Sequence, residues 1–127
     1  MSNYTWSQNL DKHQWKERVI YIVADKENHA LLEQQFDLLN RDKQGLVDRN
    51  IVVYKCLEGK YTFYNWNDKP KINTASNISE GFKIVLVGLD GGEKYSSNTI
   101  VESDVIFNLI DAMPMRRQEL EARKKND

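Results

Sequence analysis

The sequence predicts a single α/β domain built on a central mixed sheet of four or five strands, with helices flanking the sheet. Residues 18–24 form a near-continuous run of β-branched and aromatic side chains, which is typical of a strand buried on both faces. A helix-spaced apolar pattern and a second β-branched run follow, and the three segments together predict a β-α-β unit with parallel strands. Later in the chain, two short runs around a glycine-rich turn, followed by another helical pattern, predict a β-β-α unit.

The β-α-β unit comes first along the chain. Asp25 and Asn28 offer the side-chain oxygens that cap helix N-termini, and apolar residues then recur at helical spacing. We therefore expect a helix over residues 28–41 and a turn at Gly45. The second strand is expected over residues 50–57.

An irregular aromatic excursion is expected over residues 58–81. Pro70 and many polar residues interrupt any periodic pattern there, although residues 61–64 fit a short strand and residues 74–80 fit one helical turn. The aromatic side chains of this excursion are Tyr61, Phe63, Tyr64 and Trp66. They suit two roles, because aromatic residues both cover sheets and anchor binding surfaces.

The β-β-α unit begins with a strand over residues 82–88. Residues 90–92 read Asp-Gly-Gly, a strong signal for a tight turn, and a short antiparallel strand over residues 94–96 is expected to follow. The order β-α-β, excursion, β-β-α is that of a thioredoxin-like core.

A final helix is expected to begin at a cap formed by Ser103 or Asp104, and Pro114 is expected to end or kink it. Beyond it, residues 118–127 form a charged tail that predicts a frayed helix. Residues 1–17 are polar with spaced aromatic residues and predict an N-terminal arm with one helical turn. All 127 residues are thus expected to belong to one domain.

The composition argues against several classes of protein. The chain has 18 Lys and Arg against 19 Asp and Glu, and its net charge of −1 argues against a nucleic-acid partner. The longest apolar run, residues 19–24, is far shorter than the roughly 20 residues of a membrane-spanning helix. One cysteine, Cys56, excludes an intramolecular disulfide, a Cys-X-X-Cys pair and a cysteine-rich zinc site. We therefore expect a soluble domain with no membrane span.

The corner between the first strand and the first helix lacks the residues of a thioredoxin-type enzyme. Such an enzyme needs a low-pKa thiolate there, whereas residues 24–28 contain no cysteine, serine or threonine. Cys56 lies in a strand, where a lone cysteine is usually an inert apolar residue. His13 and His29 lie in different elements and are expected to face solvent. We expect no catalytic residue, no metal and no cofactor.

Four strings of residues resemble one known family. Residues 85–94 read Val-Leu-Val-Gly-Leu-Asp-Gly-Gly-Glu-Lys and residues 110–119 read Ile-Asp-Ala-Met-Pro-Met-Arg-Arg-Gln-Glu. In addition, Trp15-Lys-Glu-Arg18 and Asp48-Arg49 each lead into a strand. These strings are similar to the domain of unknown function 4174 family over nearly the whole chain.

The resemblance implies a thioredoxin-like fold with no established activity. Many bacterial members look exported, and the same domain occurs in animal extracellular matrix proteins, including coiled-coil domain-containing protein 80 and sushi-repeat-containing proteins. We therefore expect a periplasmic or secreted location if a signal peptide has been removed, and a cytoplasmic one otherwise. The sequence departs from the family at Leu89, where lysine is more usual.

The predicted topology brings the polar strings to one end of the domain. The first two strands begin there, the third strand ends there, and the final helix returns there. The candidate cluster comprises Arg18, Asp48, Arg49, Asp90, Gly91, Gly92, Asp111, Arg116 and Arg117. Its carboxylates and arginines can form structural ion pairs, or arginines left unpaired can bind an anion. Met113 and Met115 are expected to pack under the sheet or the N-terminal arm.

These observations predict a non-catalytic adaptor or binding domain that contacts a protein or matrix partner. The missing nucleophile at the corner and the family resemblance both favour this function. The alternative is a redox or small-molecule enzyme that uses Cys56 or the arginine cluster.

Overall fold

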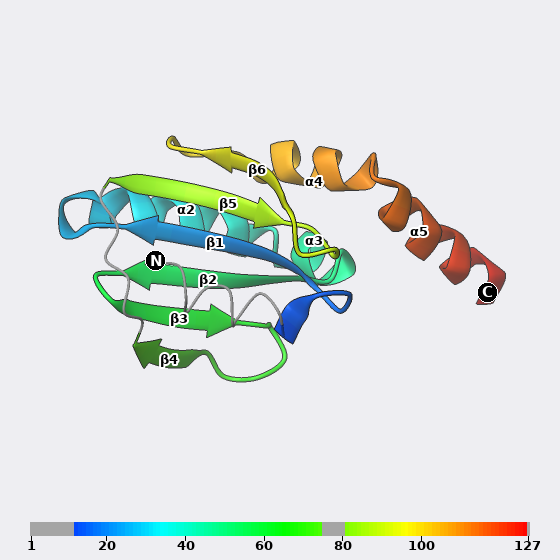
Figure 1. Cartoon of the computed structure of the whole chain (residues 1–127), viewed down its shortest axis with the longest axis horizontal. Coiled ribbons are helices and arrows are strands. Elements are labelled where there is room, and N and C mark those ends of the chain that lie inside the picture. Colours follow the sequence, from blue (N-terminus) through cyan, green and yellow to red (C-terminus); the bar gives the residue numbers. More distant parts are fainter. Residues whose placement is uncertain (1–11, 75–80, 127) are drawn as a thin grey trace.

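The computed structural model describes residues 12–74 and 81–126, which contain a mixed sheet of six strands in the order β4-β3-β2-β1-β5-β6 (Figure 1). The strands are β1 Arg18–Ala24, β2 Ile51–Leu57, β3 Lys60–Tyr64, β4 Lys71–Thr74, β5 Phe82–Val87 and β6 Glu93–Ser97. The prediction of four or five strands was therefore wrong. The unexpected strand, β4, lies at the edge of the sheet, and its Ile72 is 72% exposed, so this apolar residue does not mark a buried face.

The predicted β-α-β unit is confirmed. Strands β1 and β2 pair in parallel, with Arg18 opposite Ile51, and β5 pairs antiparallel with the other side of β1. Strand β6 returns antiparallel to β5 after the predicted tight turn, in which Gly88 N donates to Gly92 O. Gly91 has a φ of +84°, a left-handed conformation that glycine adopts without a steric penalty.

Helices α2 His29–Arg41 and α3 Lys43–Asp48 connect β1 to β2, and a short 3-10 helix, η1 Lys26–Asn28, precedes them. The turn predicted at Gly45 was wrong, because this glycine lies inside α3. A Cβ at Gly45 would stand 2.5 Å from a ring carbon of Phe107, so the glycine permits close packing of a helix instead of a turn.

Helices α4 Ser103–Asp111 and α5 Pro114–Asn126 complete the chain. The N-cap of α4 is Glu102, not Ser103 or Asp104 as expected. Pro114 is the first residue of α5, a position where the missing proline N–H costs no helical hydrogen bond. The tail expected to fray is helical as far as Asn126, whereas the helical turn expected over residues 74–80 falls largely outside the described residues.

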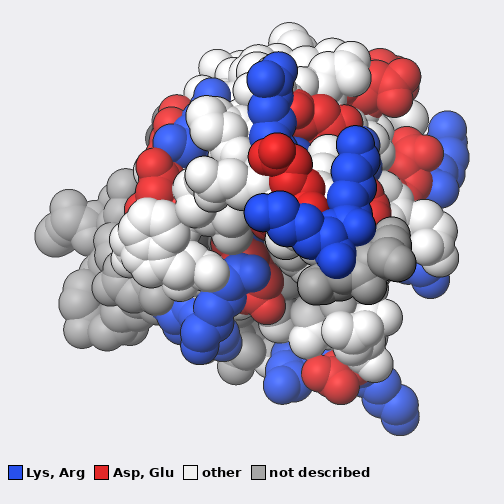
Figure 2. All heavy atoms as spheres, turned by 90° about the vertical axis from the view of Figure 1, so that its right-hand side faces the viewer, with Lys and Arg blue, Asp and Glu red and all other residues white. Residues whose placement is uncertain are grey.

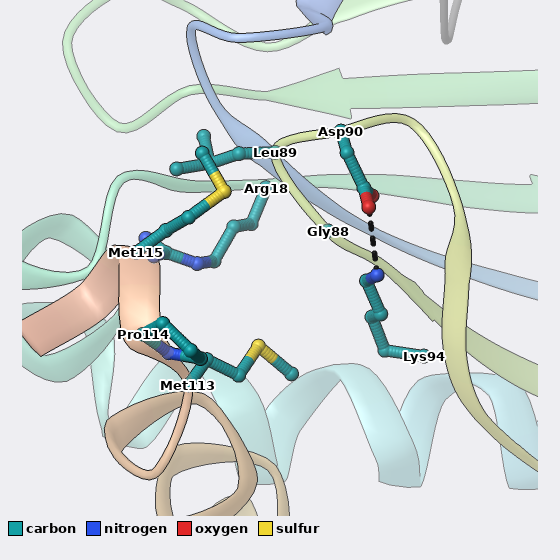
Figure 3. A pocket seen from close by; sticks show the side chains of 8 residues that line it. All are labelled: Arg18, Gly88, Leu89, Asp90, Lys94, Met113, Pro114 and Met115. Atoms are coloured by element: carbon teal, nitrogen blue, oxygen red, sulfur yellow. Dashed lines mark hydrogen bonds and ion pairs between the residues drawn. The ribbon is translucent and has the colours of Figure 1, made fainter.

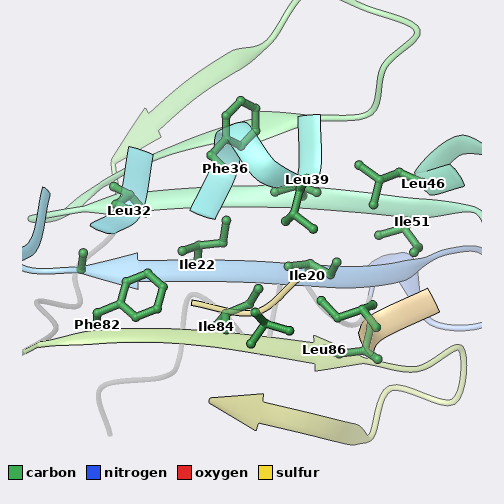
Figure 4. Packing of buried hydrophobic residues seen from close by; sticks show 14 of the residues in the cluster. Ile20, Ile22, Leu32, Phe36, Leu39, Leu46, Ile51, Phe82, Ile84 and Leu86 are labelled. Atoms are coloured by element: carbon green, nitrogen blue, oxygen red, sulfur yellow. The ribbon is translucent and has the colours of Figure 1, made fainter. Parts of the chain in front are cut away.

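The larger core lies between one face of the sheet and helices α2, α3 and α4 (Figure 4). Alternate residues of β1 divide between the two faces: Ile20 and Ile22 point into this core, whereas Val19 and Val23 belong to a second cluster on the opposite face. Burial of each such side chain contributes roughly 1.5–3 kcal/mol. This two-sided burial explains the near-continuous apolar run in the sequence of β1.

Candidate functional site

The first residues of β1 and β2, the end of β5 and helix α5 lie at the same end of the molecule, on the right of Figure 1. We call this the motif end. Viewed from that side, blue Lys and Arg side chains alternate with red Asp and Glu side chains over the surface (Figure 2). Many of these side chains form a network of ion pairs. Two arginines of the network, Arg18 and Arg116, are almost completely buried.

Arg116, on α5, is the centre of this network. Its Nη2 donates to Asp48 Oδ2 at 2.6 Å, and its Nε donates to Asp111 Oδ1 at 3.3 Å. Its Nη1 donates to the Asp48 carbonyl at 3.1 Å and to Glu119 Oε1 at 3.2 Å. Because the side chain is 3% exposed, these oxygens replace the water that a guanidinium otherwise binds. Arg116 thereby joins α5 to the ends of α3 and α4.

Arg49 forms a bidentate ion pair with Asp111. Its Nε and Nη2 donate to the two carboxylate oxygens at 3.0 Å and 2.8 Å, the geometry that makes arginine–carboxylate pairs strong. The guanidinium also lies 4.3 Å from the ring centre of Phe107. The hydrogen bonds from Arg49, assisted by Arg116, hold the pKa of Asp111 below its ordinary value despite partial burial.

The Asp48 carboxylate accepts hydrogen bonds from both Arg116 and Arg123. Arg123 Nη1 donates to Asp48 Oδ1 at 2.8 Å. Burial acts to raise the pKa of Asp48, but the hydrogen bonds from the two arginines outweigh burial and lower this pKa.

Arg18, the first residue of β1, is only 1% exposed. Its Nη1 donates to the Arg49 carbonyl at 2.7 Å and to the Glu119 carboxylate at 3.2 Å. Its Nη2 is buried and has no hydrogen-bond partner among the residues that the structure describes. This atom departs from the rule that buried polar groups are paired. Leaving a buried donor unpaired costs about 1–3 kcal/mol.

Two members of the network, Glu119 and Arg123, were not among the predicted cluster residues. Both belong to α5, where Arg116, Glu119 and Arg123 are spaced by three and four residues and therefore share one helix face. That spacing is the signal for them in the sequence. Across the motif end, four arginines (Arg18, Arg49, Arg116 and Arg123) pair with three carboxylates (Asp48, Asp111 and Glu119).

The remaining predicted cluster residues stand apart from this network. Asp90 pairs with Lys94 Nζ at 2.9 Å instead of with an arginine, and it also accepts from Gly92 N within the turn. Gly91 forms the turn itself. Arg117 is exposed, and its guanidinium makes no ion pair with any residue in the described ranges.

A cavity of about 240 Å³ lies between the β5–β6 turn and the junction of α4 and α5 (Figure 3). Its walls include Arg18, Leu89, Lys94, Met113, Pro114 and Met115. Met113 also packs against the larger core, while Met115 lies beside the Arg18 side chain in Figure 3.

A family model described as a domain of unknown function (DUF4174) matches residues 9–119. The chain belongs to this family. The match covers the three carboxylates of the network and every arginine except Arg123. No curated protein and no solved structure matches the chain. In this DUF4174 domain, none of the described helices combines the length and apolar character that a membrane span needs.

The opposite end of this DUF4174 domain contains the corner between β1 and α2. Asp25 Oδ1 accepts from Asn28 N at 3.0 Å and from Asn28 Nδ2 at 2.7 Å, and its Oδ2 accepts from Gly81 N at 2.6 Å. The hydrogen bond from Gly81, followed by that from Asn28, lowers the pKa of Asp25. The carboxylate therefore joins the start of the first helical segment to the start of β5.

Cys56 and His13 are buried, whereas His29 is exposed. Cys56 is only 7% exposed, and this burial raises the pKa of its thiol. His13 was expected to face solvent, but it is 3% exposed and its Nε2 lies 2.7 Å from Tyr54 Oη. His29 is exposed and pairs with Glu33. The described residues contain no group of three or more side chains placed to hold a metal ion.

The aromatic residues of the excursion divide between the faces of the sheet. Tyr64 and Trp66 pack against Phe36 of α2, with a ring separation of 4.4 Å between Tyr64 and Phe36. Tyr61 and Phe63 pack around Tyr54 on the opposite face. Trp66 Nε1 also donates to the Ile51 carbonyl. These contacts favour a covering role over a separate binding surface.

Proposed function

We propose that this chain is a non-catalytic binding domain with a thioredoxin-like core, which acts by contact with a protein or matrix partner. The order β2-β1-β5-β6, with β1 and β2 parallel and the other pairs antiparallel, supports the thioredoxin-like part of the proposal. A location in the cell envelope or outside the cell is part of the same proposal, and it rests on the family resemblance.

The observation that carries the proposal is the corner between β1 and α2. A thioredoxin-type enzyme needs a nucleophile at this position. Here Asp25 occupies it, and both of its oxygens already accept backbone N–H groups. Lys26 and Glu27, the exposed residues of the corner, have no neighbouring cysteine, serine or threonine in the sequence. The corner is therefore suited to capping a helix and not to covalent chemistry.

The alternative, a redox enzyme that uses Cys56, has less support. The reactive form of cysteine is the thiolate, and burial raises the pKa of Cys56, so the neutral thiol predominates at pH 7. The thiol is also shielded within an apolar cluster that includes Val23 and Val52.

Turnover assays test the proposal directly. Insulin reduction and peroxide consumption should both stay at the rate of a protein-free control for the wild type. Turnover that Cys56→Ser abolishes would establish the redox alternative. Labelling of Cys56 by a thiol reagent supplies a positive readout, because the native protein should react far more slowly than the same protein unfolded in urea.

A further inference from the structure

The cavity at the motif end combines apolar walls with one charged group. Leu89, Met113, Pro114 and Met115 are its apolar lining residues, and Arg18 is a charged residue that also lines it (Figure 3). Lys94 also lines the cavity, but its ammonium group is paired with Asp90. At about 240 Å³ the cavity is smaller than the roughly 300–1,000 Å³ of sites for drug-sized ligands, so it suits a compact molecule.

Arg18 is the group in this cavity that lacks an acceptor. Its Nη1 donates to the Arg49 carbonyl and Glu119, whereas its buried Nη2 has no hydrogen-bond partner in the described parts of the chain. Met115 lines the same cavity and lies beside the guanidinium in Figure 3. A methionine side chain is unbranched and adapts readily, and binding of an acceptor at the buried Nη2 requires Met115 to rotate away from it.

The surrounding charges favour an anionic acceptor. Four arginines of the motif end pair with three carboxylates, which leaves the network with one surplus positive charge. A single carboxylate balances this charge and can accept a charge-assisted hydrogen bond from Nη2. A phosphate dianion fits less well, because it carries more acceptors than one guanidinium nitrogen can satisfy and the walls are apolar.

We propose that this cavity binds a small monocarboxylate, with its carboxylate on Arg18 Nη2 and a short apolar stem among Leu89, Met113 and Met115. The inference rests on the proposed binding function and names the ligand chemistry of the motif end. The same chemistry occurs in a free short-chain acid and in the C-terminal carboxylate of a peptide that ends in an apolar residue.

Calorimetric titration of the full chain at pH 7 and low salt tests this site, with sodium hexanoate as the probe and 1-hexanol as its neutral counterpart. Hexanoate should bind saturably with one site per chain and at least about tenfold more tightly than 1-hexanol. A peptide ending in free leucine, compared with its C-terminal amide, separates the two sources of the carboxylate. Equal binding of acid and alcohol, or no saturable binding of any carboxylate, overturns the proposal.

Substitution of Met115 locates the site without removing a buried ion pair. Met115→Glu supplies a carboxylate beside Arg18 within the chain itself, so it should weaken hexanoate binding at least about tenfold relative to the isosteric Met115→Gln. It should also melt at a higher temperature than Met115→Gln. Arg117→Met, which removes an exposed arginine that makes no ion pair with the described residues, is the matched control and should keep hexanoate binding. Equal hexanoate affinities in the two Met115 variants overturn the assignment to this cavity.

The two failures are distinguishable. If insulin or peroxide is turned over in a Cys56-dependent manner, the proposed function fails, whether or not hexanoate binds. If the turnover assays are silent and hexanoate does not bind, the proposed function stands and the ligand assignment alone fails.

Discussion

The two ends of the sheet are held by different chemistry. At the corner between β1 and α2, one carboxylate, Asp25, accepts N–H groups from residues 28 and 81. At the motif end, two nearly buried guanidinium groups, Arg18 and Arg116, bind carboxylates and carbonyl oxygens. Both carboxylate oxygens of Asp25 accept hydrogen bonds, whereas the motif end keeps a surplus charge and, among the described residues, an unpaired donor. The proposed ligand site therefore lies opposite the corner at which a thioredoxin-type enzyme would act.

The largest expected effect comes from the centre of the ionic network. Arg116→Met should lower the free energy of unfolding by about 2–4 kcal/mol, because it leaves three carboxylates without their shared partner. We expect less than the cost of a fully buried pair, since Asp48 and Asp111 are 48% and 40% exposed and regain water. Urea denaturation measures this difference.

The matched control is Arg117→Met, which removes an exposed arginine from the next position of α5. It should change the free energy of unfolding by no more than about 0.5 kcal/mol. Equal losses for the two variants would show that the network does not hold the motif end together.

The pair of Arg49 and Asp111 should give the next largest effect. A double-mutant cycle with Arg49→Met and Asp111→Asn should yield a coupling energy of about 1 kcal/mol, because the contact is bidentate but the Asp111 side chain is 40% exposed. The exposed pair of Asp90 and Lys94 serves as the comparison and should couple by about 0.5 kcal/mol or less. A larger coupling energy for Asp90 and Lys94 than for Arg49 and Asp111 would contradict the claim that the arginine network stabilises the motif end.

Asp25 at the corner should produce a pH-dependent effect. Its folded-state pKa is lowered, first by Gly81 and then by Asn28, so its carboxylate stabilises the fold above the ordinary aspartate pKa. That stabilisation is lost as the pH falls below about 4, through the folded-state pKa. Asp25→Asn keeps a capping oxygen but cannot accept from both Asn28 N and Gly81 N. The variant should melt below the wild type at pH 7, and melting curves should show this gap shrinking below about pH 4.

The smallest effect is expected at Lys26, an exposed residue of the same corner. Lys26→Ala should change the free energy of unfolding by no more than about 0.5 kcal/mol, and hexanoate binding should be unaltered. Loss of hexanoate binding in a well-folded Lys26→Ala variant would place the binding site at the corner instead of at the motif end.

Strands buried on two faces were the most predictable part of the fold. The bounds of β1 follow from its sequence because Val19, Ile20, Ile22 and Val23 are all buried, on alternate sides. Strand β4 could not be predicted in this way, since it is held by edge hydrogen bonds to β3 and Ile72 is exposed. Gly45 was misassigned because glycine at a turn and glycine at a close helix contact look alike in sequence.

The candidate site was predictable in its position but not in its pairing. The order of strands placed Arg18, Arg49 and Asp111 at one end, and the structure brings them together there. The partner of Arg18 is Glu119, however, and this choice depends on the direction in which α5 leaves Pro114. Likewise, the unpaired Nη2 of Arg18 depends on side-chain packing that periodicity does not encode.

The comparison between the two ends is tested most directly by mapping backbone amide chemical shifts while hexanoate is added to the wild-type protein. The account predicts that the largest shifts occur at the cavity, around Gly88, Leu89, Met113 and Met115, with little change at Lys26 and Glu27. Shifts that are largest at residues 25–28, or that spread evenly over the chain, would contradict the claim that the motif end is the binding end.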